Sequence, residues 1–278
     1  LEMAHVIARK KGYTIHEDCE KPLLALFAKS QIKGKNDSGN GRLVRNVIEV
    51  AILNQSQRVL RNPDADLTVL THEDFQFTDT SSFDLEAKLA PIVGLENVKT
   101  FVRNQYHLLI AQEKRKKAGL NVDTSQTLHM IFSGNPGTGK TTIARIMAKM
   151  FKEMGVLKSG HLVEVDSGGL ISQYAGGTVK KTEEVFRSTL GGVLFIDEAY
   201  ALATSGGSYG LEAINTLVKL MEDYREDVVV ILAGYEKEME EFLKTNPGLD
   251  SRFPHRIHFP DYSPRELFEI AKIPLVSH

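Results

Sequence analysis

Apolar residues recur at every third or fourth position through the first 75 residues of the chain. This spacing predicts amphipathic helices over residues 1–11, 17–31 and 41–60, with a short fourth helix over 71–75. The polar, glycine-rich stretch 33–41 predicts an exposed loop that ends at the start of the third helix. The N-terminal part is therefore expected to be a small all-α domain over residues 1–75.

The pattern changes after residue 75. Residues 76–91 have the mixed polarity of a linker, and Pro91 disfavours a helix there. Short runs rich in Val, Ile, Leu and Phe then alternate with helical stretches, at residues 128–134, 161–166, 192–198 and 227–234. This alternation predicts a parallel sheet covered by helices on both faces, and so an α/β domain over residues 92–263. Residues 264–278 begin one more helix.

Composition narrows the class of protein without indicating a partner. The 278 residues include 34 basic and 36 acidic side chains that are interspersed, so no basic surface indicates nucleic acid. The single cysteine, Cys19, cannot form an intrachain disulfide and is expected to be a core residue in a reducing compartment. No apolar stretch has the length of a membrane span. We therefore expect a soluble, cytoplasmic protein with no membrane or nucleic-acid partner.

The strongest chemical signal is the stretch GNPGTGKTT at residues 134–142, between a predicted strand and a predicted helix. It fits G-x-x-x-x-G-K-[ST] in full, with Gly134, Gly139, Lys140 and Thr141 in the fixed places. The backbone N–H groups of such a loop and the positive end of its helix bind nucleotide phosphates. Lys140 is expected to reach the β and γ phosphates, and the Thr141 hydroxyl to bind Mg²⁺. The expected nucleotide-binding residues of this loop are Asn135, Pro136, Gly137, Thr138, Gly139, Lys140, Thr141 and Thr142.

A second signal is VLFIDEAY at residues 193–200, where a predicted buried strand ends in two carboxylates. Asp197 is expected to hold Mg²⁺ through water, and Glu198 to polarise the water that attacks the γ phosphate. The neighbouring glutamate favours water as the acceptor, and therefore hydrolysis over phosphoryl transfer to a small molecule.

Six segments, in order, resemble one branch of the AAA+ ATPase family. They are IVGLENVK, SGNPGTGKTT, SQYAGGTVKKT, LFIDEAYAL, VVVILAGYEKEMEEFLKTNPGLDSRF and FPDYSPREL. Together they are similar to the CbbX-like branch, which includes red-type Rubisco activase and the stage V sporulation protein K group. The resemblance covers residues 92–273. It implies an α/β, RecA-like P-loop core of three layers, ATP and Mg²⁺ as cofactors, and a hexameric ring that remodels a protein client.

The resemblance also assigns roles to residues outside the phosphate loop. Val93 and Gly94 resemble the segment that lies against the adenine. Tyr174, in the stretch QYAGG, resembles the aromatic residue of the first pore loop, which grips a threaded polypeptide. Residues 205–210 are rich in glycine and serine and could form a second pore-facing loop.

Arg252 resembles the arginine finger that is offered to the γ phosphate in the neighbouring subunit. An arginine suits this role because its fixed charge and planar fork neutralise the negative charge that spreads over the phosphoryl oxygens. Arg256 is close in sequence and is the alternative finger. Either assignment implies that hydrolysis requires assembly.

The chain departs from the family pattern at the end of the run 227–234. Many AAA+ proteins have an asparagine or threonine there that orients the attacking water, whereas this chain has Gly234 and Tyr235. Asn246 could take that role, but a turn-forming Asn-Pro accounts for it equally well.

The order of the parts is also unusual. A helical lid follows the core in this family, and only its beginning is present here, near residues 263–267. Residues 1–75 themselves resemble such a lid, with Arg42 in the place of the lid arginine, and FEIAKI at 268–273 can be laid over LEMAHV at 1–6. We therefore expect the lid of one module followed by the core of the next. Arg42 then serves the preceding module's nucleotide or, in a permuted arrangement, this one, unless it is a solvated arginine at a helix start.

Two functions of different classes fit this sequence. The first is Mg²⁺-dependent ATP hydrolysis by a ring-forming module that remodels or threads a protein client. The second is a nucleotide-gated assembly or scaffold module with little turnover, which the missing water-orienting asparagine would allow.

Overall fold

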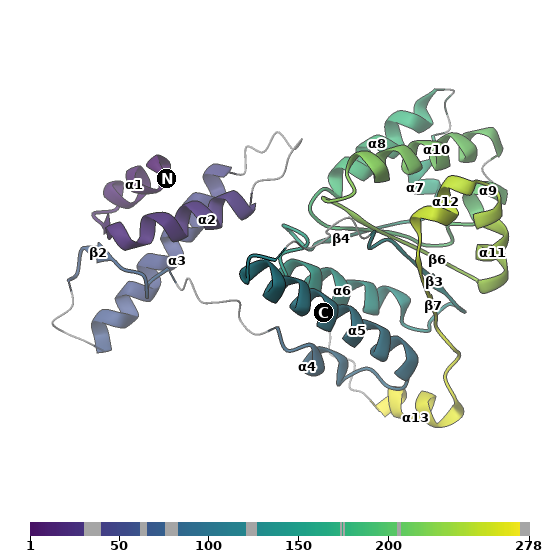
Figure 1. The fold of residues 1–278 in the computed structure, drawn as a ribbon, viewed down its shortest axis with the longest axis horizontal. Coiled ribbons are helices and arrows are strands. Elements are labelled where there is room, and N and C mark those ends of the chain that lie inside the picture. The colour runs from purple at the N-terminus through teal and green to yellow at the C-terminus, as the bar shows by residue number, and fades with distance from the viewer. Residues whose placement is uncertain are drawn as a thin grey trace. The chain divides into compact units, whose positions relative to one another are not determined.

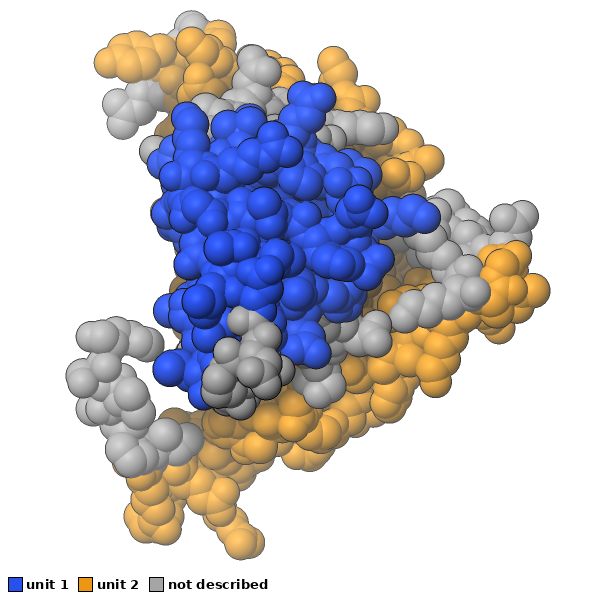
Figure 2. Space-filling model, turned by 90° about the vertical axis from the view of Figure 1, so that its left-hand side faces the viewer, with its two compact units in different colours: residues 1–82 blue, residues 83–278 orange. Residues whose placement is uncertain are grey.

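The computed structural model of the protein describes residues 1–30, 40–61, 66–75, 83–120, 127–172, 174, 176–204 and 207–272. The chain forms two compact units, residues 1–82 and 83–278, which Figure 2 shows in different colours. The end of α2, the start of α3 and some side chains in α3 and α5 lie outside the described side chains.

Unit 1 is mostly helical. Its elements are α1 (Glu2–Lys10), β1 (Thr14–Ile15), the 3-10 helix Glu17–Cys19, α2 (Glu20–Ser30), α3 (Asn40–Arg61) and β2 (Val69–Leu70). Small and branched apolar side chains fill its core, among them Ala4, Cys19, Leu23 and Ile48. Burial raises the pKa of the Cys19 thiol to about 11, so Cys19 is the neutral core residue that we expected.

Two details of unit 1 differ from the sequence prediction. The parallel pairing of β1 with β2 was not predicted, because strands of two residues carry no periodic signal. The helix predicted over 71–75 is wrong: these residues form a turn in which the carboxylate of Asp74 accepts hydrogen bonds from the backbone N–H and hydroxyl of Thr71. A side chain that bonds its own neighbouring backbone in this way favours a turn over a helix.

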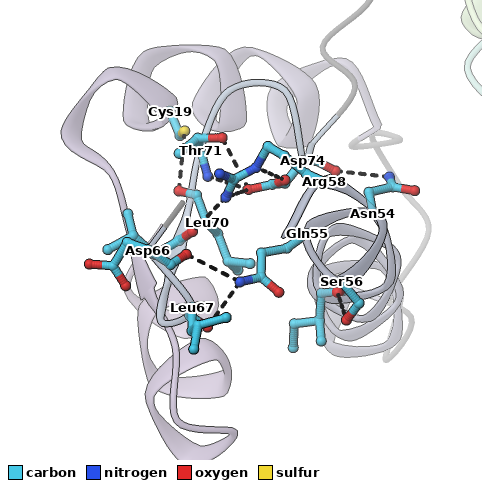
Figure 3. Close-up of polar contacts among 12 residues, drawn as sticks. Cys19, Asn54, Gln55, Ser56, Arg58, Asp66, Leu67, Leu70, Thr71 and Asp74 are labelled. Atoms are coloured by element: carbon cyan, nitrogen blue, oxygen red, sulfur yellow. Dashed lines mark hydrogen bonds and ion pairs between the residues drawn. The ribbon is translucent and has the colours of Figure 1, made fainter. Parts of the chain in front are cut away.

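A buried ion pair holds this turn on α3 (Figure 3). The guanidinium of Arg58 donates to both carboxylate oxygens of Asp74, at 2.7 and 2.9 Å, and to the carbonyl of Val69 at 3.1 Å. The Asp74 side chain is fully buried. Burial on its own would raise the pKa of Asp74, but the hydrogen bonds from Arg58 and Thr71 outweigh it and hold the pKa below its usual value. Asp74 is therefore ionised in the folded protein.

Arg58→Leu should lower the free energy of unfolding of unit 1 by about 3 kcal/mol, because it leaves a buried carboxylate without its cation. This loss is measured by chemical denaturation, in which hydrogen exchange of the α3 amides reports the unfolding of unit 1. Arg45→Leu is the matched control, since Arg45 lies exposed on the same helix. An equal effect of the two substitutions would contradict the stabilising role of the pair.

The loss should also depend on pH. A carboxylate whose pKa is lowered in the folded state stabilises the protein above its unfolded pKa, about 3.9, and this contribution disappears as the pH falls through the folded pKa. The difference between the wild-type protein and Arg58→Leu should therefore shrink below about pH 4.

Unit 2 is built on a parallel sheet of five strands in the order β4-β5-β6-β3-β7. The strands are β3 (Met130–Ser133), β4 (Leu162–Val165), β5 (Val193–Ile196), β6 (Val229–Gly234) and β7 (His255–His258). Every residue of β5 and β6 is buried, as expected of central strands covered on both faces. Strand β7 was not predicted.

Helices cover both faces of this sheet, with α5 and α6 on one side and α8 and α10 on the other (Figure 1). The helices are α4 (Leu85–Leu89), α5 (Glu96–Lys117), α6 (Lys140–Glu153), α7 (Ser167–Leu170), α8 (Gly177–Ser188), α9 (Ala201–Thr204), α10 (Gly207–Asp223), α11 (Glu236–Lys244), α12 (Pro247–Arg252) and α13 (Pro264–Lys272). The predicted α/β core with three layers is confirmed. Within the described ranges, no helix is both long and apolar enough to cross a membrane.

Residues 83–91, which we expected to belong to a linker over 76–91, are part of unit 2. Residues 76–82 lie outside the described part of the chain, and α4 already belongs to unit 2. Leu85 and Leu89, four residues apart on one face of α4, are buried in the main core. Asp84 caps the start of this helix, which ends before Pro91. Pro91 thus lies just beyond a helix and not in an extended linker.

Candidate nucleotide site

The phosphate loop connects β3 to α6 at the carboxyl end of the sheet. Gly139 stands at the N-cap of α6 with φ of 90°, a left-handed conformation that favours glycine. Gly134 has no room for a side chain, because a Cβ there would collide with the carbonyl oxygen of Phe259. The loop therefore needs glycine at both fixed positions, and its backbone is held where the N–H groups at the start of α6 can face an anion.

Lys140 is buried within this loop. Its ammonium donates to the carbonyls of Gly134 and Asn135, both at 2.8 Å. Burial lowers the pKa of Lys140, and the nearby negative charge of Asp197 acts in the opposite direction. Lys140 is thus a cation held in the concavity of the loop, close to the first of the two predicted carboxylates.

Asp197 and Glu198 follow β5, and β6 lies between β5 and β3 in the sheet. The carboxylate of Asp197 accepts from the backbone N–H of Glu198 at 3.0 Å, while the Glu198 side chain is exposed. Glu198 has φ of 47°, which is uncommon for a residue with a Cβ. The two neighbouring carboxylates thus differ in exposure, with Asp197 half-buried and Glu198 exposed.

The oxygens expected to bind Mg²⁺ have the right chemistry for it. Magnesium prefers oxygen ligands and usually takes one or two carboxylates together with substrate phosphates. The Thr141 hydroxyl, in the first turn of α6, and the Asp197 carboxylate, whose charge acts on Lys140, are such groups. The residues present therefore fit a magnesium ion bound with a nucleotide.

A segment that the sequence did not connect to the site crosses the phosphate loop. The Asn135 amide donates to both carboxylate oxygens of Asp261, at 2.8 and 2.9 Å. The Tyr262 hydroxyl donates to the carbonyl of Thr138 at 3.3 Å. The segment just before α13 is thereby hydrogen-bonded to the loop.

The segment expected to contact the adenine lies beside the same loop. A Cβ on Gly139 would be 3.6 Å from Cδ1 of Leu95, the residue after Gly94. Gly94 has φ of 61°, and a side chain there would collide with the carboxylate of Glu266 on α13. Residues 93–95 therefore stand between the phosphate loop and α13, a place consistent with contact to a base.

A pocket of about 270 Å³ opens next to the loop, at the carboxyl ends of β6 and β7. Its lining is Gly134, Asn135, Tyr235, Glu236, Glu238, His258, Phe259 and Asp261. It shares Asn135 with the expected nucleotide-binding residues and Gly134 with the rest of the loop, and Lys140, Asp197 and Glu198 are not part of it. The pocket therefore lies beside the nucleotide site and does not define it.

The missing water-orienting residue has a steric explanation. A Cβ at Gly234 would lie 2.8 Å from Cδ1 of Tyr200 and 2.9 Å from Sδ of Met239, so a side chain there would have to displace these two side chains. Asn246 caps α12: its side-chain oxygen accepts from the N–H of Gly248, and its amide donates to Asn215. Both polar ends of Asn246 are engaged, which favours the turn interpretation of this residue.

Sequence models of known families match both units. That of the ATPase family associated with various cellular activities (AAA) matches residues 130–261, and that of the AAA lid domain matches residues 1–84. Protein CfxQ homolog of Pyropia yezoensis is 43% identical over 221 residues, which are 79% of this chain and 72% of that protein. The chain belongs to the AAA ATPase family, in the CbbX-like branch.

Other relatives in this AAA branch are more similar over a shorter length. Stage V sporulation protein K of Bacillus subtilis is 50% identical over 190 residues, covering 68% of this chain and 59% of that protein. Protein CbbX of Cereibacter sphaeroides is 51% identical over 182 residues, covering 65% of this chain and 59% of that protein. The chain therefore spans about three fifths of the length of these two relatives.

The expected arginine finger is partly buried in this AAA core. Arg252, at the end of α12, donates to the carbonyl of Gly248 at 3.0 Å and to Glu222 on α10 at 3.3 Å. Its Nε is buried and has no hydrogen-bond partner among the described residues. Arg256, the alternative, is on β7 and pairs with Asp250. Arg252 is thus the arginine whose position the fold fixes more fully.

Its positive charge also reaches a buried histidine. Burial, and to a lesser degree the charge of Arg252, lower the pKa of His129 to about 4. The Nδ1 atom of His129 accepts from the backbone N–H of Val230. His129 is therefore neutral near pH 7, and it does not compete with Arg252 as a cation.

The remaining predicted residues are on other elements: Tyr174 and residues 207–210 belong to unit 2, and Arg42 belongs to unit 1. Tyr174, just before α8, is 80% exposed. Residues 207–210, predicted to be part of a flexible second pore loop, form the first turn of α10, and 205–206 lie outside the described residues. Arg42 is in the first turn of α3, and its side chain also lies outside the described part.

Proposed function

We propose that this AAA module hydrolyses ATP with Mg²⁺, as part of a ring that remodels a protein client. One observation carries the proposal: a buried ammonium and two carboxylates lie at the carboxyl end of the same parallel sheet. The ammonium is that of Lys140, after β3, and the carboxylates are those of Asp197 and Glu198, after β5. This combination suits phosphate binding and activation of water, and a phosphate-binding loop alone would not need the exposed Glu198.

The proposed reaction uses the side chains in separate roles. The phosphates lie on the loop N–H groups, and Lys140 exchanges the carbonyls of Gly134 and Asn135 for β and γ phosphate oxygens. Thr141 and Asp197 would hold magnesium, which neutralises charge on the phosphates. Glu198 accepts a proton from the water whose oxygen attacks the γ phosphorus, and ADP leaves. Val93 and Gly94 contact the adenine.

The ring and its client are supported by the relatives and by two side chains, the exposed Tyr174 and the partly buried Arg252. One relative is named ribulose bisphosphate carboxylase/oxygenase activase, of Cyanidioschyzon merolae, and is 46% identical over 194 residues, 69% of this chain and 65% of that protein. We infer a protein client for this chain too, and a homo-hexamer as the assembly. Tyr174 is exposed enough to grip a polypeptide, and Arg252 would complete a neighbour's site.

We also propose the tandem arrangement of modules. The match of residues 1–84 to the AAA lid domain, ahead of the core, supports it. So does α13, which starts with Ser263 and Glu266 bonded to each other and exposes Leu267 and Phe268. In this arrangement α13 is the first helix of a second lid, and Arg42 serves the preceding module.

A cytoplasmic location stays a prediction, which rests on the single cysteine.

A scaffold module with little turnover is the second candidate, because Gly234 carries no side chain that could orient water and Asn246 is engaged in a helix cap. In such a module ATP would set conformation and turnover would be slight, so rapid nucleotide exchange with little hydrolysis would favour it.

ATP hydrolysis per subunit, measured across a range of protein concentrations, distinguishes the two candidates. We expect the rate to rise with concentration. Lys140→Ala should abolish it and weaken ATP binding about 100-fold, since charge-assisted hydrogen bonds to the phosphates are lost. Lys149→Ala is the matched control, as Lys149 is exposed on the same helix. Tight ATP binding that depends on Lys140, with no hydrolysis at any concentration, would favour the scaffold.

A further inference from the structure

An acidic side chain that no sequence motif includes lies next to the proposed magnesium ligand. Glu164 is on β4, the edge strand beside β5. One of its carboxylate oxygens accepts from the Thr141 hydroxyl at 3.3 Å, and the other from the Arg145 guanidinium at 3.2 Å. Glu164 is therefore held between the first and second turns of α6.

The sheet register places Glu164 on the α6 side and near Asp197. Glu164 pairs with Phe195 of β5, so both side chains point to the same face, and Phe195 packs in the core together with Ile143 of α6. The next residue, Val165, accepts the backbone hydrogen bond of Asp197 at 2.8 Å. Glu164 thus contacts Thr141, and the residue that follows it pairs with the backbone of Asp197.

A hydroxyl can bind a cation only through its lone pairs, so its proton must point elsewhere. A carboxylate that accepts this proton fixes the rotation of the hydroxyl and adds negative charge near the metal, as acceptors around metal ligands commonly do. An exposed Glu–Arg pair on its own contributes little to stability, which leaves the contact with Thr141 as the informative one.

We propose that Glu164 is a positioning residue for magnesium: it accepts the Thr141 proton, so that the hydroxyl oxygen is presented to the ion. This inference rests on the proposed function, in which Thr141 binds Mg²⁺ together with the nucleotide. Arg145 keeps the carboxylate in place from its far side.

The test measures binding of a fluorescent ADP analogue at increasing MgCl₂ and in excess EDTA. Glu164→Ala should raise, by about tenfold, the Mg²⁺ concentration at which half of the increase in ADP binding is reached. Substitutions of residues that hold a metal ligand in place weaken metal affinity about 10–100-fold. Its ADP affinity in EDTA should stay within about twofold of wild type, since the phosphates are bound by the loop and Lys140. Glu164→Gln, which keeps an acceptor and loses the charge, should give a smaller shift.

Arg145→Ala is the matched control, because it removes the ion pair and leaves the carboxylate beside Thr141. It should shift the Mg²⁺ requirement by less than about threefold, as an exposed pair contributes little. An unchanged Mg²⁺ requirement in both Glu164 variants, or an equal shift in Arg145→Ala, would overturn the positioning role. If Mg²⁺ does not strengthen ADP binding to the wild-type protein, the metal step of the proposed function fails and this inference fails with it.

Discussion

Arg252→Ala should lower ATP hydrolysis about 1,000-fold or more, which is the range found when an arginine that neutralises phosphoryl charge is removed. Binding of ATP to a single subunit should change little, because the residue acts on the neighbour's nucleotide. Arg256→Ala should retain most of the activity. Steady-state hydrolysis and equilibrium ATP binding, measured on the same preparations, separate the two effects.

The contacts of Arg252 require a check on folding. Removing its side chain takes away the bonds to Gly248 and Glu222, so Arg252→Lys, which keeps the charge but not the planar fork, is the second variant. Both variants should melt within a few degrees of wild type, the scale of shift that about 1 kcal/mol produces. Full activity of Arg252→Lys would contradict a role in which the guanidinium makes two hydrogen bonds to the γ phosphate.

A mixing experiment tests whether Arg252 acts across subunits. Arg252→Ala supplies an intact Glu198, and Glu198→Gln supplies an intact Arg252, so each variant alone should be inactive. An equal mixture should regain about a quarter of the wild-type rate, since in a ring half of the subunits contribute the base and half of their neighbours the arginine. A mixture that stays inactive, although the subunits assemble, would place both residues in one subunit's own site.

Glu198→Gln should lower hydrolysis between about 100-fold and 10,000-fold, because the amide cannot accept the proton of the attacking water. ATP affinity should stay near wild type, since the Glu198 side chain is exposed and the phosphates are bound by the loop and Lys140. A single-turnover assay, in which ATP is bound before the reaction starts, measures the hydrolysis rate separately from ATP affinity. Glu226→Gln, an exposed substitution of the same kind before β6, is the control.

Retention of hydrolysis by Glu198→Gln would remove Glu198 as the base. Asp197→Asn then becomes the informative variant, because a carboxylate that binds the metal should change the Mg²⁺ requirement as well as the rate.

The phosphate loop and the two carboxylates could be predicted because short motifs fix their own backbone. Gly139 needs a left-handed conformation, Lys140 must follow it, and the preceding strand and following helix are set by local apolar patterns. Each of these features depends on neighbouring residues only. The roles assigned to them remain predictions until the variants above are measured.

Strand β7 could not be predicted from its own residues. Of HRIH, only Ile257 is buried, and the strand exists because the backbone of β3 pairs with it over four residues. A four-residue segment with one buried apolar side chain resembles a loop in sequence. Pairing partners that come from elsewhere in the chain decide such cases.

The contacts around the site were hidden for the same reason. Asn135 and Asp261 are 126 residues apart, and Thr141 and Glu164 are 23 apart. Glu164 did leave one signal, since it is the single acidic residue between the apolar residues of LVEV. A carboxylate on the side of a strand that faces the covering helix needs a hydrogen-bond donor on that helix.

At Glu198, the residue that would make the protein most stable is not the residue that the proposed hydrolysis of ATP needs. The φ of 47° at Glu198 is a conformation that glycine adopts freely and that residues with a Cβ adopt at a disadvantage of about 1–2 kcal/mol. A redesign of this chain that optimised only its melting temperature would therefore choose glycine at residue 198. Such a protein would be more resistant to heat and would lack the proposed general base, so computational stabilisation of this module should hold that residue fixed.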